Sequence, residues 1–399
     1  MSYSSVPIRH IRRLYSTTSS AISVSQAKSK LRYEHDPDKA LEIYSSVSKH
    51  YSSPLSSRYA QDLTVRRLAK SHRFSDIENL IESQKNDPKI TQEPFLSTLI
   101  RSYGRASMFD QALRTYDQMD QLGTPRSAIS FNALLSACIN SKLCDKVPVL
   151  FDEIPNKYGV VPDEVSYGIL AKSFCQVGTP EKALEIVKEV EQKGVKITAI
   201  TYTTILETLY KQGKSEEAEN LWNLMSKEEC IDAAAYNVKI MFEHGGKPET
   251  IKALIEEMSN AGLKPDTISY NYLMTCYLEL GMVYEAQKVY EGLEENGCKP
   301  NAATFRTLVF YLSKNGDFEK GYKIFKESVK MHKIPDFNTM KHLVEGLVNK
   351  KKIKEAKGLN RTIKKKFPPN MLNAWRKIEE NLKLTSNDAD PNEDQEAAF

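Results

Sequence analysis

The sequence has no long apolar segment and few cysteines. No run approaches the length of about 18 apolar residues that a membrane-spanning helix needs, so we expect no membrane insertion. The six cysteines never form a C-x-x-C pair. They are too sparse for a disulfide scaffold and lack the usual spacing of zinc ligands. These absences favour a soluble protein of a reducing compartment.

Catalytic motifs are missing as well. The seven histidines are scattered without metal-ligand spacing. There is no phosphate-binding glycine loop, no G-x-S-x-G turn and no H-E-x-x-H helix. The H-x-E and P-C-x-x-C zinc signature of deaminases is also absent. We therefore expect no enzymatic activity, no cofactor, no metal and no small-molecule substrate.

Basic residues are in small excess over acidic residues, and the charged residues are unevenly distributed along the chain. The chain has 56 Lys or Arg and 52 Asp or Glu, a net charge of +4. Residues 337–370 contain ten basic and two acidic residues, whereas residues 199–232 contain three basic and seven acidic residues. The basic segment suits phosphate groups. The acidic segment suits a basic protein neighbour, or it is simply a solvated surface.

A period of about 35 residues runs through the chain. Small residues mark one phase of it: Ala112, Ala183, Ala218, Ala286, Gly321 and Ala356. Glycines mark two further phases: Gly178, Gly213, Gly281 and Gly316, then Gly123, Gly159, Gly194, Gly262 and Gly297. Prolines mark a fourth: Pro162, Pro265, Pro300 and Pro335. Because four independent markers agree on one period, the chain is a repeat protein.

Each repeat has the pattern of two helices. In residues 267–301, apolar side chains first recur at i, i+3, i+4 and i+7, namely Tyr270, Leu273, Met274 and Tyr277. After Gly281 the same spacing returns with Ala286, Val289, Tyr290 and Leu293. Gly297 and Pro300 then end the second helix. One hairpin cannot bury its apolar stripe alone, so we expect stacked hairpins. The small in-phase residue should let two helices approach closely.

Segments 164–198 (EVSYGILAKSFCQVGTPEKALEIVKEVEQKGVKIT) and 267–301 (TISYNYLMTCYLELGMVYEAQKVYEGLEENGCKPN) resemble pentatricopeptide (PPR) repeats of the P class. The Y-N-x-L and P-D pairs and the glycine turn carry the resemblance. It implies an all-α fold, a right-handed α-solenoid of about ten PPR helical hairpins. The expected PPR array covers 58–370, in units 58–92, 93–127, 128–163, 164–198, 199–232, 233–266, 267–301, 302–336 and 337–370. A degenerate repeat at 34–57 should precede it, and a capping helix at 371–384 and a disordered acidic tail at 385–399 should follow.

The N-terminal segment 1–33 contains six Lys or Arg, many Ser and Thr, and no acidic residue. This composition is typical of a transit peptide, so we expect a disordered, removable leader. The sequence Arg13-Leu14-Tyr15-Ser16 resembles a plant mitochondrial processing site with cleavage after Tyr15. We expect the mitochondrial matrix as the location. Chloroplast import, or a basic arm that touches nucleic acid, are the alternatives.

PPR proteins read single-stranded RNA at about one base per repeat. By this resemblance, the fifth and last residues of a repeat meet the base edge, where amides and hydroxyls can both donate and accept. The expected pairs are Asn132/Asp163, Thr203/Asp232, Asn237/Asp266 and Asn271/Asn301. The second residue should pack on base faces, here Ile129, Ile200 and Ile268. The alternative role of any single Asn or Asp is helix capping or turn formation.

In the family code, Asn with Asp favours uracil, Thr with Asp favours guanine, and Asn with Asn favours a pyrimidine, often cytosine. Three repeats depart from the code, with the pairs Ser97/Ser127, Gly168/Thr198 and Arg306/Asp336. Basic side chains suit phosphate better than a base edge. The expected phosphate-binding residues are Arg306, Lys341, Lys350, Lys351, Lys352, Lys364, Lys365 and Lys366.

The short chain, its near-neutral charge and the lack of an appended domain resemble the PPR proteins of plant mitochondrial ribosomes. We therefore expect a non-catalytic RNA-binding protein of plant mitochondria, a component of the small ribosomal subunit that binds rRNA and neighbouring ribosomal proteins. One alternative is a free factor for the stability, processing or translation of an organellar mRNA. Another is a protein scaffold whose groove holds a peptide.

Overall fold

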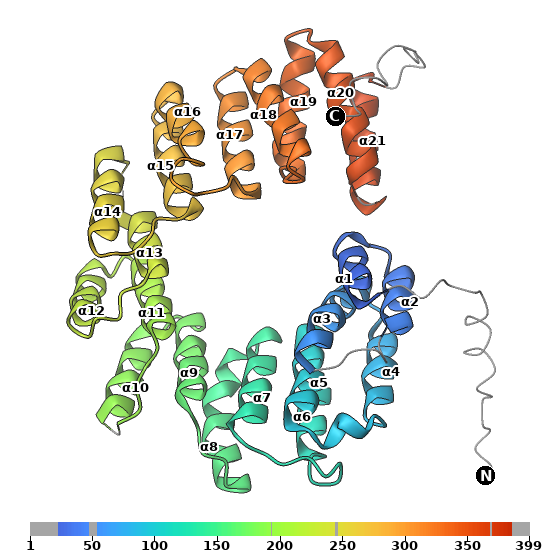
Figure 1. Ribbon diagram of the computed structural model, residues 1–399, viewed down its shortest axis with the longest axis vertical. Helices are drawn as coiled ribbons and strands as arrows, with labels where there is room; N and C mark the ends of the chain where they lie inside the picture. Colours follow the sequence, from blue (N-terminus) through green and yellow to red (C-terminus); the bar gives the residue numbers. More distant parts are fainter. Residues whose placement is uncertain (1–22, 48–53, 193, 244–245, 368, 385–399) are drawn as a thin grey trace, which may run out of the picture. The chain divides into compact units, whose positions relative to one another are not determined.

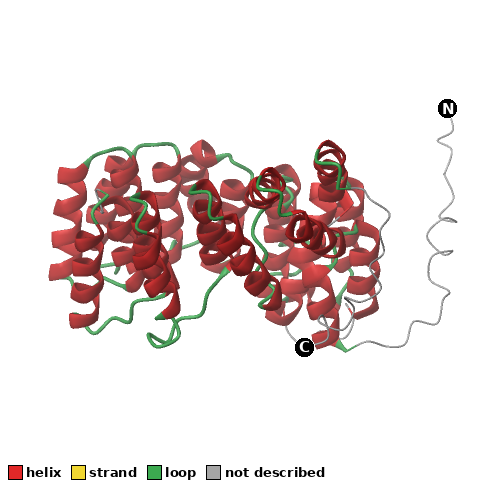
Figure 2. Ribbon diagram, turned by 90° about the horizontal axis from the view of Figure 1, so that it is seen from above, coloured by secondary structure: helices red, strands yellow, loops and turns green. Residues whose placement is uncertain are grey.

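A computed structural model describes residues 23–47, 54–192, 194–243, 246–367 and 369–384. Throughout these ranges the regular structure is helical and no strand occurs (Figure 1, Figure 2). Two short 3-10 helices, η3 (Pro88–Thr91) and η4 (Cys144–Lys146), accompany the α-helices. The all-α fold expected from the sequence is confirmed.

The chain divides into two compact units, Met1–Thr201 and Tyr202–Phe399, and the boundary falls within helix α11 (Ala199–Lys211). The first unit contains α1 (Val24–Tyr33), α2 (Pro37–Val47), α3 (Pro54–Lys70), α4 (Phe74–Gln84), α5 (Glu93–Arg105), α6 (Phe109–Asp117), α7 (Ala128–Asn140), α8 (Val147–Tyr158), α9 (Glu164–Gln176) and α10 (Pro180–Gln192). The second contains α12 (Ser215–Lys227), α13 (Ala233–Glu243), α14 (Pro248–Asn260), α15 (Thr267–Glu279), α16 (Val283–Glu291), α17 (Ala302–Lys314), α18 (Phe318–Lys330), α19 (Phe337–Asn349), α20 (Ile353–Lys366) and α21 (Pro369–Asn381).

Consecutive helices pair into hairpins, from α1 and α2 to α19 and α20, and α21 follows the last pair. In the described ranges this makes ten hairpins, which agrees with the expected number. Each expected repeat from 93–127 to 337–370 contains two complete α-helices, whereas α3 begins at Pro54, before the expected start of the repeat 58–92. The right hand of the solenoid stays a prediction.

A capping side chain and a glycine turn explain where the hairpin of the repeat 302–336 begins and reverses. In the repeat 302–336, the Asn301 side chain accepts from the backbone N–H groups of Ala303 and Thr304 at 2.9 and 3.0 Å, which starts α17. Gly316 then takes a left-handed conformation, with φ +83°, between the two helices. Asp317 and α18 follow directly.

Small residues lie where helices approach most closely. Ala112, Ala183, Ala218, Ala286 and Ala356 are all completely buried in second helices. At the equivalent Gly321 of α18, a methyl group would lie 3.3 Å from both Leu343 Cδ1 and Ser313 Oγ. Such contacts are tighter than ordinary van der Waals contacts. The close-approach role predicted for this phase of the repeat is confirmed.

The core continues from hairpin to hairpin within each unit. First helices of successive repeats pack side by side: α5 on α7 and α7 on α9 in the first unit, α15 on α17 and α17 on α19 in the second. Second helices fill the space behind them. Phe151 of α8, for example, has its ring 5.6 Å from that of Phe131 in α7 and 5.1 Å from that of Tyr167 in α9. Neighbouring repeats therefore share one apolar core.

Helix α1 corrects one expectation about the N-terminus. Residues 1–33 were expected to be a disordered leader, but Val24–Tyr33 is helical and begins with a capping box between Ser23 and Gln26. Ala27 and Leu31, one turn apart, are completely buried against Tyr44 and Val47 of α2. Lys28 is half-buried and Lys30 and Arg32 are exposed, so α1 is an amphipathic helix and the first hairpin begins at α1 rather than at residue 34. The cleavage site after Tyr15 lies outside the described residues.

Helix α21 covers the C-terminal end of the last hairpin. It starts at Pro369, near the start of the expected capping helix, and its Trp375 is buried. The Trp375 ring meets Phe337 of α19 edge-on, with ring centroids 5.6 Å apart. The indole N–H donates to Asn360 Oδ1 of α20 at 2.8 Å. The acidic tail 385–399 lies outside the described residues.

Candidate nucleic-acid interface

The second residues of three repeats expose apolar side chains at the start of first helices. Ile129 is 46% exposed on α7, Ile200 is 74% exposed on α11 and Ile268 is 45% exposed on α15. An isoleucine left in water at the same place of three repeats does not serve the core. It suits a flat apolar partner such as the face of a base.

The pair Asn132 and Asp163 is joined directly in the structure, across the junction between two repeats. Asn132 Nδ2 donates to Asp163 Oδ1 at 2.9 Å. A third group completes the arrangement: the Ser166 hydroxyl donates to Asn132 Oδ1 at 2.7 Å. Asn132 itself is only 5% exposed. We call such a set of fifth residue, last residue and following hydroxyl a junction triad.

The second unit contains two more junction triads, in consecutive repeats. In the first, Asn237 Nδ2 donates to Asp266 Oδ1 at 3.2 Å, and the Ser269 hydroxyl donates to Asn237 Oδ1 at 2.7 Å. In the second, Asn271 Nδ2 donates to Asn301 Oδ1 at 3.4 Å, and the Thr304 hydroxyl donates to Asn271 Oδ1 at 2.8 Å. The same hydrogen-bond pattern therefore recurs with Asp or Asn at the last position and with Ser or Thr as the hydroxyl.

The last residue of each triad also caps the next first helix. Asp163 Oδ1 accepts from the Ser166 N–H at 2.8 Å, and Asp266 Oδ1 accepts from the Ile268 N–H at 2.8 Å. At Asp163, burial works against ionisation. The donors Asn132 Nδ2 and the Ser166 N–H outweigh it, and the pKa of Asp163 lies below its ordinary value. The carboxylate is thus charged at neutral pH.

Capping decides which atom of the last residue remains for a ligand. All side-chain hydrogen bonds between Asp266 and the other described residues use Oδ1, which leaves the acceptor Oδ2. The side chain of Asn301 also uses only Oδ1, so its Nδ2 remains as a donor. The two neighbouring repeats therefore offer opposite hydrogen-bonding groups at the same place.

The pair Thr203 and Asp232 is not brought together. Asp232 Oδ1 accepts from the Ala235 N–H at 2.8 Å, and Thr203 Oγ1 is a buried hydroxyl without a hydrogen-bond partner. The third residue of the next repeat is Ala235, so the hydroxyl that completes the other triads is missing. This repeat has the residues of the family code without the hydrogen bonds that accompany them elsewhere.

The three repeats with departing pairs fill their junctions in other ways. The buried Glu93 carboxylate accepts from the Ser127 N–H at 2.7 Å and from its hydroxyl at 2.8 Å. Gly168 offers no side chain, and a methyl group there would lie 2.9 Å from the Thr201 hydroxyl. Arg306 is exposed and makes no ion pair with the described residues.

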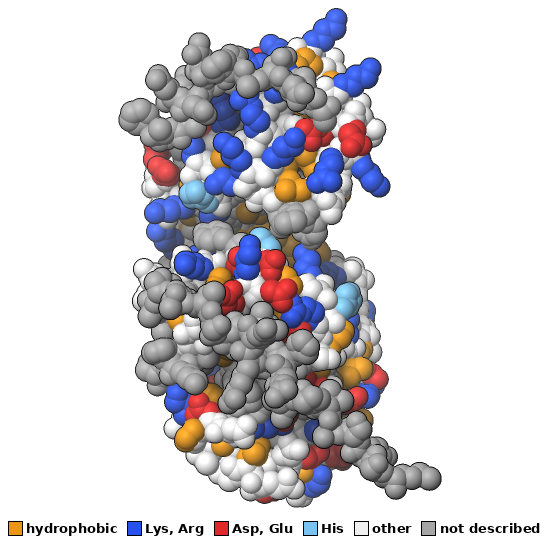
Figure 3. All heavy atoms as spheres, turned by 90° about the vertical axis from the view of Figure 1, so that its right-hand side faces the viewer, with side chains coloured by type: hydrophobic (Ala, Val, Ile, Leu, Met, Phe, Trp, Pro, Cys, Tyr) orange, Lys and Arg blue, Asp and Glu red, His pale blue; other side chains and the backbone are white. Residues whose placement is uncertain are grey.

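The basic residues of the second unit gather at its C-terminal end. Residues 202–295 contain eight Lys or Arg against 17 Asp or Glu, whereas residues 296–384 contain 21 against eight. Figure 3 shows Lys and Arg side chains crowded over the end of the unit that carries α20 and α21. The described part of this unit thus has an acidic half followed by a basic half.

Three of the lysines expected to bind phosphate already have carboxylate partners. Lys364 Nζ lies 2.5 Å from Glu379 Oε1, Lys352 Nζ lies 2.5 Å from Glu319 Oε1, and Lys341 Nζ lies 3.9 Å from Glu345 Oε1. Glu379 is buried, and its pKa is lowered because the donors Lys364 and Asn360 outweigh the effect of burial. Among the lysines expected to bind phosphate, those that are exposed and make no ion pair with the described residues are Lys350, Lys351, Lys365 and Lys366.

The repeats match known sequences. Sequence models of the PPR repeat match residues 96–124, 129–157, 200–230 and 303–332, and a model of the PPR repeat family matches 162–211 and 265–310. The small ribosomal subunit protein mL103 (rPPR7) of Arabidopsis thaliana is 63% identical over 410 residues, an alignment that covers 100% of both chains. This chain belongs to the pentatricopeptide repeat family. The resemblance seen in the sequence is confirmed.

Two further relatives illustrate the range of similarity. A mitochondrial pentatricopeptide repeat-containing protein of Arabidopsis thaliana is 56% identical, over 97% of this chain and 94% of the relative. The crystal structure of the pentatricopeptide repeat protein PPR10 from maize is 17% identical, with a TM-score of 0.44 over 90% of this chain and 59% of that chain.

The PPR pattern did not reveal the third-position hydroxyls. Ser166, Ser269 and Thr304 are completely buried, and they complete the triads from the following repeat. A sequence signal for them exists: a hydroxyl residue three positions after the capping Asp or Asn is the pattern of a capping box. The structure adds that the same hydroxyl also reaches the asparagine of the repeat before.

A small aromatic surface accompanies the basic fifth residues. Phe310 follows Arg306 by one turn of α17 and is partly exposed. Its ring lies 6.2 Å from that of His342, which directly follows Lys341 on α19. An exposed ring beside cations suits stacking on a base next to phosphate contacts. The i, i+4 spacing of Arg306 and Phe310 was the available sequence signal.

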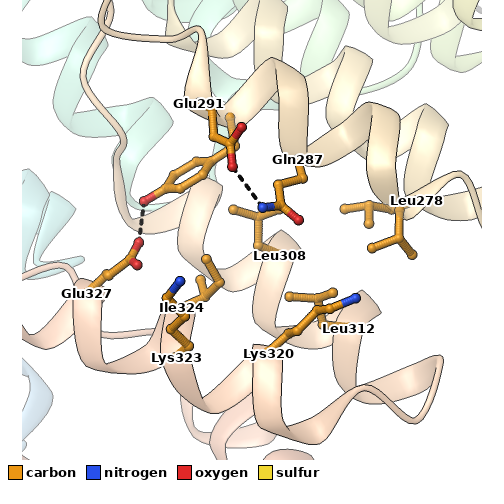
Figure 4. A pocket seen from close by; sticks show the side chains of 11 residues that line it. Leu278, Gln287, Glu291, Leu308, Leu312, Lys320, Lys323, Ile324 and Glu327 are labelled. Atoms are coloured by element: carbon orange, nitrogen blue, oxygen red, sulfur yellow. Dashed lines mark hydrogen bonds between the residues drawn. The ribbon is translucent and has the colours of Figure 1, made fainter.

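A cleft of about 290 Å³ lies between helices α15 to α18. Figure 4 shows the side chains that line it. Its apolar lining includes Leu278, Leu308 and Leu312. Its polar groups largely satisfy one another: Tyr290 Oη donates to Glu327 Oε2 at 2.9 Å, and Gln287 Nε2 donates to Glu291 Oε1 at 2.7 Å. It shares no residue with the junction triads, and we assign no ligand to it.

The described helices carry neither a membrane span nor a metal centre. None of them is both long and apolar enough to cross a membrane. Nor do the described residues bring three or more His, Cys, Asp or Glu together in a way that could hold a metal ion.

Proposed function

We propose that this chain is a non-catalytic, RNA-binding component of the small subunit of plant mitochondrial ribosomes, in contact with rRNA and neighbouring ribosomal proteins. The observation that carries the proposal is the 63% identity with mL103, which extends over the whole of both chains. The mitochondrial relative that is 56% identical supports a location in the mitochondrial matrix.

The charge distribution supports two kinds of contact. The basic half of the second unit, with Lys350, Lys351, Lys365 and Lys366 exposed, suits the phosphates of RNA. The segment 202–295, in which acidic residues are in excess, repels phosphate and suits a positively charged protein neighbour. A protein held between RNA and other proteins does not need the strongly basic composition of a free RNA-binding protein.

Sedimentation tests the ribosomal part of the proposal. Mitochondrial extract that contains the tagged full-length chain is separated on a sucrose gradient under conditions that dissociate the two ribosomal subunits. We expect the chain to sediment with the small subunit in amounts close to those of its other proteins. A chain found only at the top of the gradient would contradict the proposal.

A free factor for one organellar mRNA is the second candidate, and the three junction triads favour it. Asn132, Asn237 and Asn271 each retain hydrogen-bonding groups for a base, which a purely structural clamp of rRNA does not need. Crosslinking in organelles followed by RNA sequencing separates the two functions. Reads confined to small-subunit rRNA support the ribosomal component, and reads from one or two mRNAs support the free factor.

A further inference from the structure

The three junction triads share a hydroxyl that comes from the following repeat. Ser166, Ser269 and Thr304 are each the third residue of their repeat. Each donates to the asparagine of the preceding repeat, at 2.7, 2.7 and 2.8 Å. All three side chains are completely buried, so a ligand cannot touch them. Any effect of these hydroxyls on RNA recognition therefore acts through the asparagine or through the last residue of the pair, whose Oδ1 lies 2.9, 3.4 and 3.3 Å from the three hydroxyls.

Asn237 illustrates how the amide is held from two sides. Its Nδ2 donates to Asp266 Oδ1, and its Oδ1 accepts from the Ser269 hydroxyl. A carboxylate only accepts, so Asp266 requires the NH2 end of the amide on its side. The hydroxyl fixes the oxygen end. One N–H and one lone pair of Asn237 then remain for a base, with their directions set.

We propose that the third-position hydroxyl of a repeat is a specificity-determining positioning residue for the base site of the preceding repeat, and that its ligand is a pyrimidine of single-stranded RNA. The inference rests on the proposed RNA-binding function. Uracil presents an acceptor at position 4 and a donor at N3, whereas cytosine presents the reverse. An asparagine that cannot turn accepts only one of these patterns. Without the hydroxyl, only the last residue holds the amide, so the amide can tilt and distinguishes the two bases less sharply.

The chain contains a natural counterpart that lacks the hydroxyl. The repeat 199–232 has Thr203 and Asp232, but the third residue of the next repeat is Ala235. The Thr203 hydroxyl is buried and has no hydrogen-bond partner, and Asp232 accepts from a backbone N–H of the next helix. The position can therefore be changed in both directions: Ser269→Ala removes a hydroxyl from a complete triad, and Ala235→Ser adds one to an incomplete set.

The test measures base preference position by position. The purified full-length chain is incubated with single-stranded RNA randomised over about twelve nucleotides, one per repeat with a margin, and the bound RNA is sequenced. Asn237→Thr changes the fifth residue itself and so identifies the position that repeat 233–266 reads. At that position, Ser269→Ala should lower the uracil-to-cytosine ratio about five- to tenfold, the effect of one lost hydrogen bond. The neighbouring positions should keep their preferences.

Two further variants control the result. Ser269→Thr should retain the wild-type ratio, because Thr304 makes the same hydrogen bond in the next repeat. Ala235→Ser should strengthen the preference at the position of repeat 199–232, since it supplies a partner for Thr203. Thermal unfolding of each variant shows whether its fold has changed.

Three results would overturn the inference. The first is an unchanged ratio in Ser269→Ala. The second is an equal loss of preference at all positions together with a lower unfolding midpoint, which marks the hydroxyl as merely structural. The third is an Ala235→Ser variant with unchanged preference. If the wild-type chain itself enriches no sequence, the base-reading function fails first, and the inference fails with it.

Discussion

Gly104 tests how closely the first helices must approach each other. It lies inside α5, and a methyl group at this position would be 2.4 Å from Ala137 Cα and 2.5 Å from Ala137 Cβ of α7. Ordinary van der Waals contact begins at 3.4 Å. The obstacle is backbone, which cannot turn aside like the end of a side chain, so in Gly104→Ala the two helices must separate by about 1 Å.

Two opposing effects determine how much Gly104→Ala changes the free energy of unfolding. Alanine favours a helix over glycine by about 1 kcal/mol. Overpacking a well-packed contact typically costs about 1–3 kcal/mol, and the loss is at the upper end when backbone must move. We expect Gly104→Ala to lower the free energy of unfolding by about 1–2 kcal/mol net.

Gly168→Ala is the matched control in the same unit. Gly168 also lies within a first helix, α9, and gains the same helix propensity. The only near atom is the Thr201 hydroxyl at 2.9 Å, which can rotate away. We expect this variant to be unchanged or more stable by up to about 1 kcal/mol.

The measurement is urea unfolding of the full-length chain, followed by circular dichroism at the helical band. Because repeat arrays can unfold in more than one step, the transition of the first unit is compared between the variants. A Gly104→Ala chain as stable as Gly168→Ala would refute the argument, since it would mean that α5 and α7 can separate without loss.

Four further variants test the site and the C-terminal end. Asn301→Asp replaces the remaining donor Nδ2 by an acceptor, so in the RNA selection the position read by repeat 267–301 should shift from cytosine toward uracil; an unchanged preference would refute the capping argument. The pKa of Glu379 is lowered in the folded state, so the ionised carboxylate stabilises the fold at pH values above the ordinary pKa of 4.5. This contribution is lost as the pH falls through the folded-state pKa. The unfolding midpoint of Glu379→Gln should therefore depend less on pH below about 5 than that of wild type. Replacing both Lys365 and Lys366 by Ala should weaken RNA binding equally for all sequences and reduce the salt dependence of the affinity by about two counterions, as filter binding at several salt concentrations would show. The replacement of Lys364, which pairs with Glu379, should instead lower stability.

Much of the fold could be predicted because the same sequence pattern recurs in each repeat. The spacing of Tyr270, Leu273, Met274 and Tyr277 identified a first helix, and α15 covers all four. The buried Ala286 confirmed the close helix approach expected at its phase. Where one repeat departs from the pattern, as α1 does, the prediction was wrong, since its basic residues outweighed the buried Ala27 and Leu31 in the sequence.

For the candidate site, the sequence predicted the residues but not the contacts between them. The family pattern identified Asn237 and Asp266 as a pair, but it did not show that they are hydrogen bonded to each other or that Ser269 holds them. The concentration of basic residues in 337–370 placed Lys364 among the phosphate-binding residues, whereas the structure pairs Lys364 with a buried carboxylate. In both cases the missing partner lies about 15 to 35 residues away, beyond the range of any helical spacing.

Local pattern alone was enough for the helices of the regular repeats, their turns and their order, because hydrophobic spacing and glycine positions act within one hairpin. Which polar atoms remain available to a ligand depended on the stacking of one hairpin on the next. Only that stacking brings the third residue of a repeat to the fifth residue of the repeat before it, and a hydrogen bond between side chains forms only within about 3 Å. The sequence within each repeat thus determines its two helices, whereas contacts between neighbouring repeats determine the binding surface.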